Sequence, residues 1–200
     1  MLSYCQNNPI TYADSTGMCA HTLYAPWMGD CSDCITYDVP LYEQGTLNLC
    51  WAFCQVMIEQ FYSTQYPKIS QVAAIVRAVS LAMASTRNTG DWNKPGIPKN
   101  CITYRFSDEP MFYTVTNEFF SIDLAQKLQT FGPLYAYYSK ENGDGAHMVV
   151  VTGVNLKDDI VYTNNPWGKR GEQSFADFMN GFVGNGGDNY QLAYLVFPRA

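Results

Sequence analysis

The stretch EQGTLNLCWAFCQVMIEQFY, residues 43–62, carries the clearest structural pattern in the chain. Apolar side chains recur there at helical spacing, at Trp51, Cys54, Met57, Ile58 and Phe61. This spacing predicts a helix over residues 50–63, with Cys50 in its first turn. A helix N-terminus favours negative charge through its free N–H groups and aligned peptide dipoles, so a cysteine there readily becomes a nucleophilic thiolate. Cys54, one turn further on, is expected in the core.

The rest of the chain shows helix patterns first and strand patterns afterwards. Two further helices are predicted over residues 69–85 and 121–132, with a polar loop at 86–100 between them. The later segments predict strands at 133–139, 147–154, 159–164 and 190–198 and a short helix at 174–182. Helices followed by a largely antiparallel sheet indicate an α+β fold in two halves.

Two of these helices carry details that a structure can check. The second helix has an apolar side formed by Val72, Ile75, Val76, Val79 and Met83. Ser121 is the expected N-cap of the third helix, and Gly132 is expected to end it.

Composition narrows the class of protein. A net charge of −6 and a pI near 4.7 argue against nucleic acid or an anionic membrane as the main partner. The longest apolar stretch, QVAAIVRAVSLAMA, contains Arg77 and is too short to span a bilayer. No secretory signal is expected, because MLSYCQNNPI has neither a basic nor an apolar segment. Seven cysteines, an odd number, favour free thiols over a disulfide framework.

A reactive cysteine needs a base, and the chain has two histidines. His21 lies in an irregular leader, whereas His147 opens a predicted strand directly after the turn NGDGAH. The next strand ends in TNNPWG, which offers an amide that could orient the imidazole. The backbone N–H of Cys50 and the side-chain amide of Gln44 could stabilise an oxyanion.

Four motifs occur in order: Gln44-Gly45, Cys50-Trp51-Ala52-Phe53, Ala146-His147 and Asn165-Pro166-Trp167-Gly168. Together they resemble the papain-like cysteine proteases. The resemblance covers roughly residues 42–198. It implies a helical half with the thiolate, a β half with the imidazolium, and a protein or peptide substrate in the cleft between them.

The resemblance also implies a role for each residue. Cys50 would be the nucleophile, and His147 the general base and acid. Asn165 would orient His147, because in the family a tryptophan follows this asparagine by two residues, which selects Asn165 over Asn164. Gln44 would complete the oxyanion hole. No metal and no cofactor are implied.

The chain departs from papain in two ways. The residues between Gln44 and Cys50 are GTLNL, so Leu47 stands where papain has a half-cystine. The interval from Cys50 to His147 is 97 residues, shorter than in papain. This short form resembles bacterial papain-like and bacteriocin-leader-processing peptidases.

Each site residue also has a purely structural interpretation. Cys50 could be a buried core thiol, and His147 a hydrogen-bonded histidine at a strand end. Asn165 could be a turn residue before proline, and Gln44 a solvated loop residue.

Two tryptophans are candidates for substrate binding. Trp92 lies in the 88–98 loop, which is expected to form part of a cleft wall and a side-chain pocket. Trp167 is expected to pack over the hydrogen bond between Asn165 and His147, at the edge of the same cleft.

The leader has a resemblance of its own. The run YCQNNPITYADSTG, residues 4–17, is similar to the end of the core in RHS/YD-repeat proteins, where a variable C-terminal toxin follows. This resemblance implies a leader at residues 1–40, a peptidase domain at residues 41–200, delivery as part of a larger protein, and an immunity protein as a further partner.

Several alternatives remain open at this point. The same scaffold serves glutamine deamidases, transglutaminases and isopeptidases, and the domain could act only on its parent chain, between Gly17 and Asp38. It could also be a silent binding module, although such a module needs no intact Cys, His and Asn. A zinc site would have to use Cys19, His21, Cys31 and Cys34, a weak pattern with a single CxxC.

Overall fold

The computed structural model describes residues 12–13, 21–22, 34–63, 68–89, 111–114, 119–141, 145–184 and 187–197. Its helices are α1 (Cys50–Tyr62), α2 (Gln71–Thr89), α3 (Ser121–Phe131) and α4 (Phe175–Asn180). Its strands are β1 (Tyr12–Ala13), β2 (His21–Thr22), β3 (Cys34–Thr36), β4 (Met111–Thr114), β5 (Leu134–Lys140), β6 (Ala146–Asn155), β7 (Ile160–Asn165), β8 (Lys169–Ser174), β9 (Phe182–Val183) and β10 (Asn189–Phe197).

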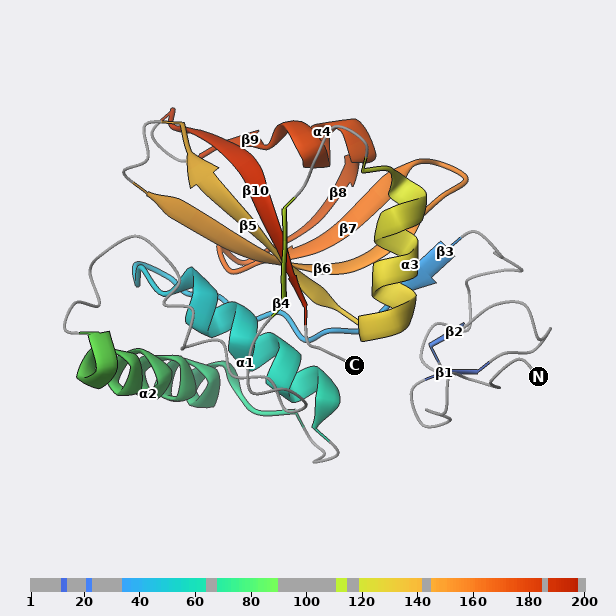
Figure 1. Cartoon of the computed structure of the whole chain (residues 1–200). Coiled ribbons are helices and arrows are strands. Elements are labelled where there is room, and N and C mark those ends of the chain that lie inside the picture. Colours follow the sequence, from blue (N-terminus) through green and yellow to red (C-terminus); the bar gives the residue numbers. More distant parts are fainter. Residues whose placement is uncertain are drawn as a thin grey trace.

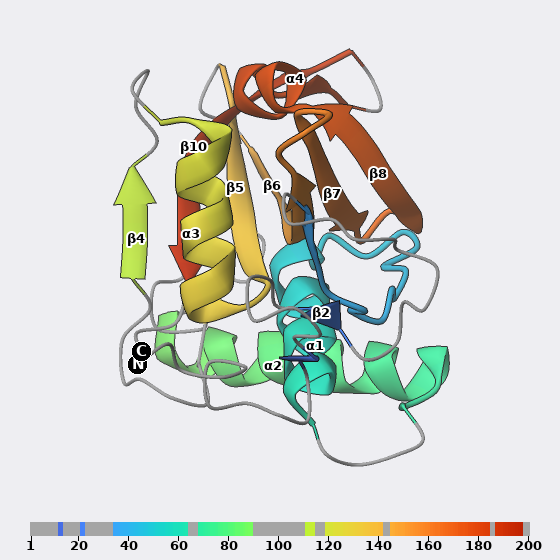
Figure 2. The ribbon, with the colours of Figure 1, turned by 90° about the vertical axis from the view of Figure 1, so that its right-hand side faces the viewer.

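One eight-stranded antiparallel sheet organises most of the described part of the chain, and β1 and β2 pair separately. Its strands follow the order β4-β10-β5-β6-β7-β8, with β3 added to β6 and β9 added to β10. Helix α1 lies against one side of this sheet, and α2 lies beyond α1 (Figures 1 and 2). The α+β fold predicted from the sequence is confirmed, with a helical part and a largely antiparallel β part.

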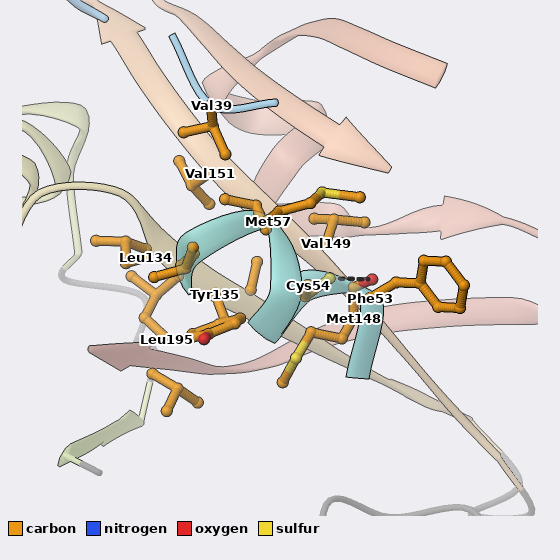
Figure 3. Packing of buried hydrophobic residues seen from close by; sticks show 14 of the residues in the cluster. Val39, Phe53, Cys54, Met57, Leu134, Tyr135, Met148, Val149, Val151 and Leu195 are labelled. Atoms are coloured by element: carbon orange, nitrogen blue, oxygen red, sulfur yellow. Dashed lines mark hydrogen bonds between the residues drawn. The ribbon is translucent and has the colours of Figure 1, made fainter. Parts of the chain in front are cut away.

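The main core lies between α1 and the centre of the sheet. Met57 and Cys54 of α1 point toward Val149 and Val151 of β6, and Tyr135 of β5 lies beside them (Figure 3). All five side chains are buried. Because α1 is buried along most of its length, its first turn is held firmly against the beginning of β6.

Helix α2 differs from the prediction about its apolar side. The residues that it buries are Ala74, Ala78 and Ala82, while Val72 is 70% exposed and Val76 60% exposed. Small side chains spaced by four residues let α2 approach α1 closely. Of the predicted apolar side, Ile75 and Val79 are partly buried and pack against the core, whereas Val72, Val76 and Met83 are exposed. The helix also continues to Thr89, into the segment predicted as the start of a polar loop.

Other expectations agree with the structure or need small corrections. The helix predicted from Cys50 is confirmed by α1. Ser121 is the first residue of α3 rather than its N-cap, and Asp123 accepts the hydrogen bond of the Phe120 N–H there at 2.9 Å. Gly132 ends α3 as expected, with a φ of 74° that favours glycine. Among the described helices, none is long and apolar enough to cross a membrane.

Candidate active site

Cys50 is the first residue of α1, where the N–H groups of the helix have no carbonyl partner within the helix. Its side chain is half-buried. The preceding residue, Leu49, is the N-cap, and no side-chain hydrogen bond caps the helix there. The thiol is near the N–H groups of Cys50, Trp51 and Met148, each of which lowers the pKa of Cys50. Burial outweighs these contacts and raises the pKa of Cys50 above its ordinary value.

The main chain of Met148 ties α1 to β6 beside the site. Cys54 donates its S–H to the carbonyl oxygen of Met148 at 3.3 Å (Figure 3), and the Met148 N–H lies near Cys50. The two sulfurs, one helical turn apart, therefore both contact the main chain of Met148, one at its N–H and one at its carbonyl oxygen. Because Met148 follows His147 in β6, the thiol of Cys50 lies beside the strand end that carries His147.

His147 and Asn165 are brought together by the pairing of β6 with β7. Nε2 of His147 lies 2.9 Å from Oδ1 of Asn165, and the same oxygen accepts the Trp167 N–H at 3.0 Å. An atom that accepts from a backbone N–H must be the oxygen of the amide, so the neutral imidazole carries its proton on Nε2. Nδ1 is then the ring nitrogen that can accept a proton.

Asn164, the neighbouring asparagine, has a different place. Its side chain is buried and donates a hydrogen bond to the carbonyl oxygen of Val39 at 2.8 Å. Alternation along β7 sends successive side chains to opposite faces, so only one of the two asparagines reaches His147.

The segment before α1 is anchored to the turn that follows Asn165. The N–H of Gln44 donates to the carbonyl oxygen of Pro166 at 2.7 Å. Gln44 is buried, and its Nε2 donates to the carbonyl oxygen of Leu47 at 2.6 Å, which leaves a second amide hydrogen. Its Oε1 is buried without a hydrogen-bond partner among the described residues. Gly45, between Gln44 and Leu47, has a φ of 59°, a conformation that favours glycine, and makes the turn there.

Trp167 covers the imidazole of His147. The two ring centroids lie 4.0 Å apart and the ring planes are within 23° of each other, which is a stacked contact. His147 is 3% exposed, and this burial lowers its pKa to about 4, although the hydrogen bond to Asn165 acts in the opposite direction.

A family model described as papain-like cysteine protease AvrRpt2 matches residues 33–182, most of the chain. The chain belongs to this family. It is therefore a cysteine peptidase with a papain-like fold. A comparison with curated proteins finds no match.

The AvrRpt2 family match spans all six predicted site residues, the four catalytic ones together with Trp92 and Trp167, and it ends at Phe182. Trp92 lies outside the described residues. The RHS-like run at 4–17 precedes the match, and apart from residues 12–13 it also lies outside the described part.

The zinc alternative stays untested, because two of its four proposed ligands lie outside the described residues. His21 lies in β2 and Cys34 in β3, whereas Cys19 and Cys31 are outside the described residues. The described residues contain no group of three or more His, Cys, Asp or Glu side chains suited to a metal.

Sequence reasoning missed three aromatic residues near the site of this AvrRpt2-family peptidase. Tyr137 of β5 is half-buried, and its pKa is raised by burial and by the nearby Cys50. Phe182 and Tyr190 lie with their rings edge-on to His147. The sequence predicts strands for Tyr137 and Tyr190 but places Phe182 at the end of the helix predicted at 174–182, whereas in the structure α4 ends at Asn180 and Phe182 lies in β9. Strand pairing decides which of these residues meet.

Proposed function

We propose that this AvrRpt2-family peptidase hydrolyses peptide bonds through an acyl-enzyme formed on Cys50. His147 is the general base and acid, and Asn165 orients it. Gln44 and the N–H of Cys50 hold the oxyanion. The observation that carries the proposal is the pair of hydrogen bonds to Oδ1 of Asn165, at 2.9 and 3.0 Å, because they leave Nδ1 of His147 as a base.

The first half-reaction forms the acyl-enzyme. Nδ1 of His147 takes the thiol proton while Sγ of Cys50 bonds to the carbonyl carbon of the substrate. The carbonyl oxygen becomes an oxyanion, which accepts hydrogen bonds from the Cys50 N–H and the second amide hydrogen of Gln44. The imidazolium then gives its proton to the leaving amine as the C–N bond breaks, and a thioester remains.

The second half-reaction releases the acid product. Neutral His147 takes a proton from water, and the hydroxide equivalent attacks the thioester carbon. The C–S bond breaks, the proton returns to Sγ of Cys50, and the carboxylic acid leaves. Asn165 keeps the imidazole in one tautomer throughout, so the same nitrogen accepts and donates the proton.

A peptide library tests the reaction. The purified chain is incubated with the library beside its Cys50→Ala variant, and the products are identified by mass spectrometry. New termini that depend on Cys50 support hydrolysis. A mass increase of about one dalton at glutamine, with no new termini, would identify a deamidase on the same scaffold and overturn the proposal.

We further propose that the peptidase is the effector domain of an RHS-type toxin, with a leader at residues 1–40 and the peptidase domain at 41–200. The run at 4–17 supports this proposal. The leader would contain β3, which pairs with β6, so its last part would be joined to the peptidase sheet. An immunity protein from the producing cell would bind the domain and block it.

Growth of bacterial cells tests the effector role. Induction of the chain is expected to arrest growth, and Cys50→Ala at the same protein level is expected to leave growth normal. Co-expression of an immunity protein restores growth of cells with the native chain. Normal growth with an active native peptidase would refute the toxin role without affecting the assignment of the reaction.

A further inference from the structure

The main chain at Glu43 and Gln44, which leads into the oxyanion-hole side of the site, is held from two sides. On one side, the N–H of Gln44 donates to the carbonyl oxygen of Pro166 at 2.7 Å. The side chain of Glu43 packs on Gly168 in the same turn, so closely that a Cβ atom there would lie 2.9 Å from the carboxyl carbon of Glu43. These contacts fix the segment relative to the turn that follows Asn165.

Gln71, the first residue of α2, holds the segment from the other side. The N–H of Glu43 donates to Oε1 of Gln71 at 3.0 Å, and Nε2 of Gln71 donates to the carbonyl oxygen of Glu43 at 2.6 Å. The side-chain amide therefore pairs with both main-chain polar groups of one residue, as two residues of neighbouring antiparallel strands do. Two parallel hydrogen bonds fix orientation as well as distance. We name this pair of bonds the Gln71 clamp.

The residue that makes the Gln71 clamp is itself held in place. Oγ of Ser70 accepts the N–H of Ala73 at 3.2 Å, which is the hydrogen bond of an N-cap, so Gln71 begins a capped helix. The hydroxyl of Tyr42 donates to the carbonyl oxygen of Ile69 at 3.2 Å, a second link between the same two segments. The amide of Gln71 therefore extends from a fixed helix start.

Helix α2 is in turn fixed to α1, the helix that carries the nucleophile. Ala74 and Ala78 of α2 are buried, and Arg77 pairs with Glu59 of α1 at 3.1 Å. Figure 2 shows the beginning of α2 on the same side of the molecule as the segment that precedes α1. Contacts therefore run from α1, through α2, to the main chain of Glu43.

The amide of Gln44 depends on this support. Its Nε2 donates to the carbonyl oxygen of Leu47 at 2.6 Å, but its buried Oε1 has no hydrogen-bond partner among the described residues. The direction of the second amide hydrogen is therefore set largely by the main chain that carries the side chain. A donor to an oxyanion must be aimed before the charge develops, and a displacement of about 1 Å can cost about 100-fold in rate.

We propose that Gln71 is a positioning residue for the oxyanion hole. It holds the main chain of Glu43, and through it the amide of Gln44, without touching the substrate. This proposal rests on the proposed function, because it concerns the oxyanion donor of that reaction. Loss of the Gln71 clamp leaves Cys50 and His147 in place and lets the amide of Gln44 move away from the developing charge.

Two variants break the Gln71 clamp in different ways. Gln71→Met keeps the length of the side chain and loses both hydrogen bonds. Gln71→Glu loses only the donor to the carbonyl oxygen of Glu43, and an acidic residue in the first turn favours the helix. A slower reaction in Gln71→Glu at undiminished stability therefore separates positioning from stability. Arg77→Ala is the matched control, because it removes an exposed contact of α2 that does not involve Glu43 or Gln44.

Two reagents probe the Cys50 sulfur with and without an oxyanion. p-Nitrophenyl acetate acylates the sulfur through a tetrahedral oxyanion and releases nitrophenolate. Iodoacetamide alkylates the same sulfur by displacing iodide, and no oxyanion forms. Nitrophenolate release is measured by absorbance and alkylation of Cys50 by mass spectrometry. The rate of Cys50→Ala is subtracted as the background from the other cysteines.

Gln71→Met is expected to lower the acylation rate about tenfold, less than the loss of about 10²–10³-fold expected when the donor itself is removed. Alkylation should keep its native rate, and Arg77→Ala should leave both rates unchanged. Because Gln71 acts through Gln44, Gln71→Met should cause no further loss in a Gln44→Ala background. Gln71→Glu takes the place of Gln71→Met if the methionine variant does not fold.

Two results would overturn the proposal: a native acylation rate in the folded Gln71 variant, or a further tenfold loss in the Gln44→Ala background. A native rate in Gln44→Ala itself would remove the oxyanion donor from the proposed mechanism, and the role of Gln71 with it. If both reagents respond as expected and no peptide is cleaved, the proposed hydrolysis fails while the positioning role of Gln71 stands.

Discussion

Acid should destabilise this protein through His147 in particular. The folded-state pKa is lowered to about 4, whereas the unfolded chain has the ordinary value of 6.5. Between these values the unfolded chain binds a proton that the folded chain does not bind, so the free energy of unfolding falls as the pH falls. The stabilisation is complete above pH 6.5 and is lost by about pH 4.

The size of the effect follows from the difference of 2.5 between the two values, 6.5 and 4. At about 1.4 kcal/mol for each pH unit, His147 alone accounts for a loss of about 3 kcal/mol. This is a large part of the stability of an ordinary domain, which is about 5–15 kcal/mol.

Urea unfolding at several pH values from 7 to 4 measures this loss. Cys50→Ala is compared with Cys50→Ala/His147→Gln, each relative to its own value at pH 7, so that other titrating groups cancel. The parent should lose about 3 kcal/mol more than the glutamine variant. His21→Gln in the same background is the control for the other histidine. Parallel curves for parent and His147→Gln would refute the reasoning.

Three further changes have predictable results. Asn165→Asp places a carboxylate at the hydrogen bond to His147. A Coulomb energy of about 4 kcal/mol should then raise the pKa of His147 by up to about 3 pH units, which NMR measures. An unchanged pKa would contradict the hydrogen bond between residues 147 and 165. Gln44→Ala should lower kcat by about 10²–10³-fold through loss of an oxyanion donor, and an unchanged kcat would remove Gln44 from the mechanism. Gly132→Ala should lower the free energy of unfolding by about 1–3 kcal/mol, because the φ of Gly132 is 74° and an added Cβ would collide with the hydroxyl of Tyr62. Urea or thermal unfolding measures this change, and an unchanged free energy would show that the turn adapts.

The sequence predicted much of the local structure because periodicity is a local property. Helix α1 begins at Cys50 as expected, and the long strands β5, β6 and β7 lie close to their predicted ranges. Strands β3 and β9 have three and two residues, too few to show a period. Strand β8, KRGEQS, is polar because it lies at the edge of the sheet, so it lacks the apolar alternation of a half-buried strand.

The apolar side of α2 shows the limit of pattern reasoning. Val72 and Val76 mark a side by hydrophobicity, yet the structure buries Ala74 and Ala78 against α1. Hydrophobicity identifies side chains that can be buried, whereas the distance between two helices decides which of them fit. The same limit explains why Tyr137 was not recognised near Cys50.

The sequence by itself determined the fold class, the helix start that carries Cys50, and the order of four motifs that resemble a papain-like protease. Only the tertiary structure showed the hydrogen bond that joins Asn165 to His147, the contacts of two cysteine sulfurs with the main chain of Met148, and the rings that surround the imidazole. The physical reason is distance along the chain. Periodicity and helix-end electrostatics act within a few residues, whereas desolvation of His147 depends on rings brought from residues 167, 182 and 190 by strand pairing.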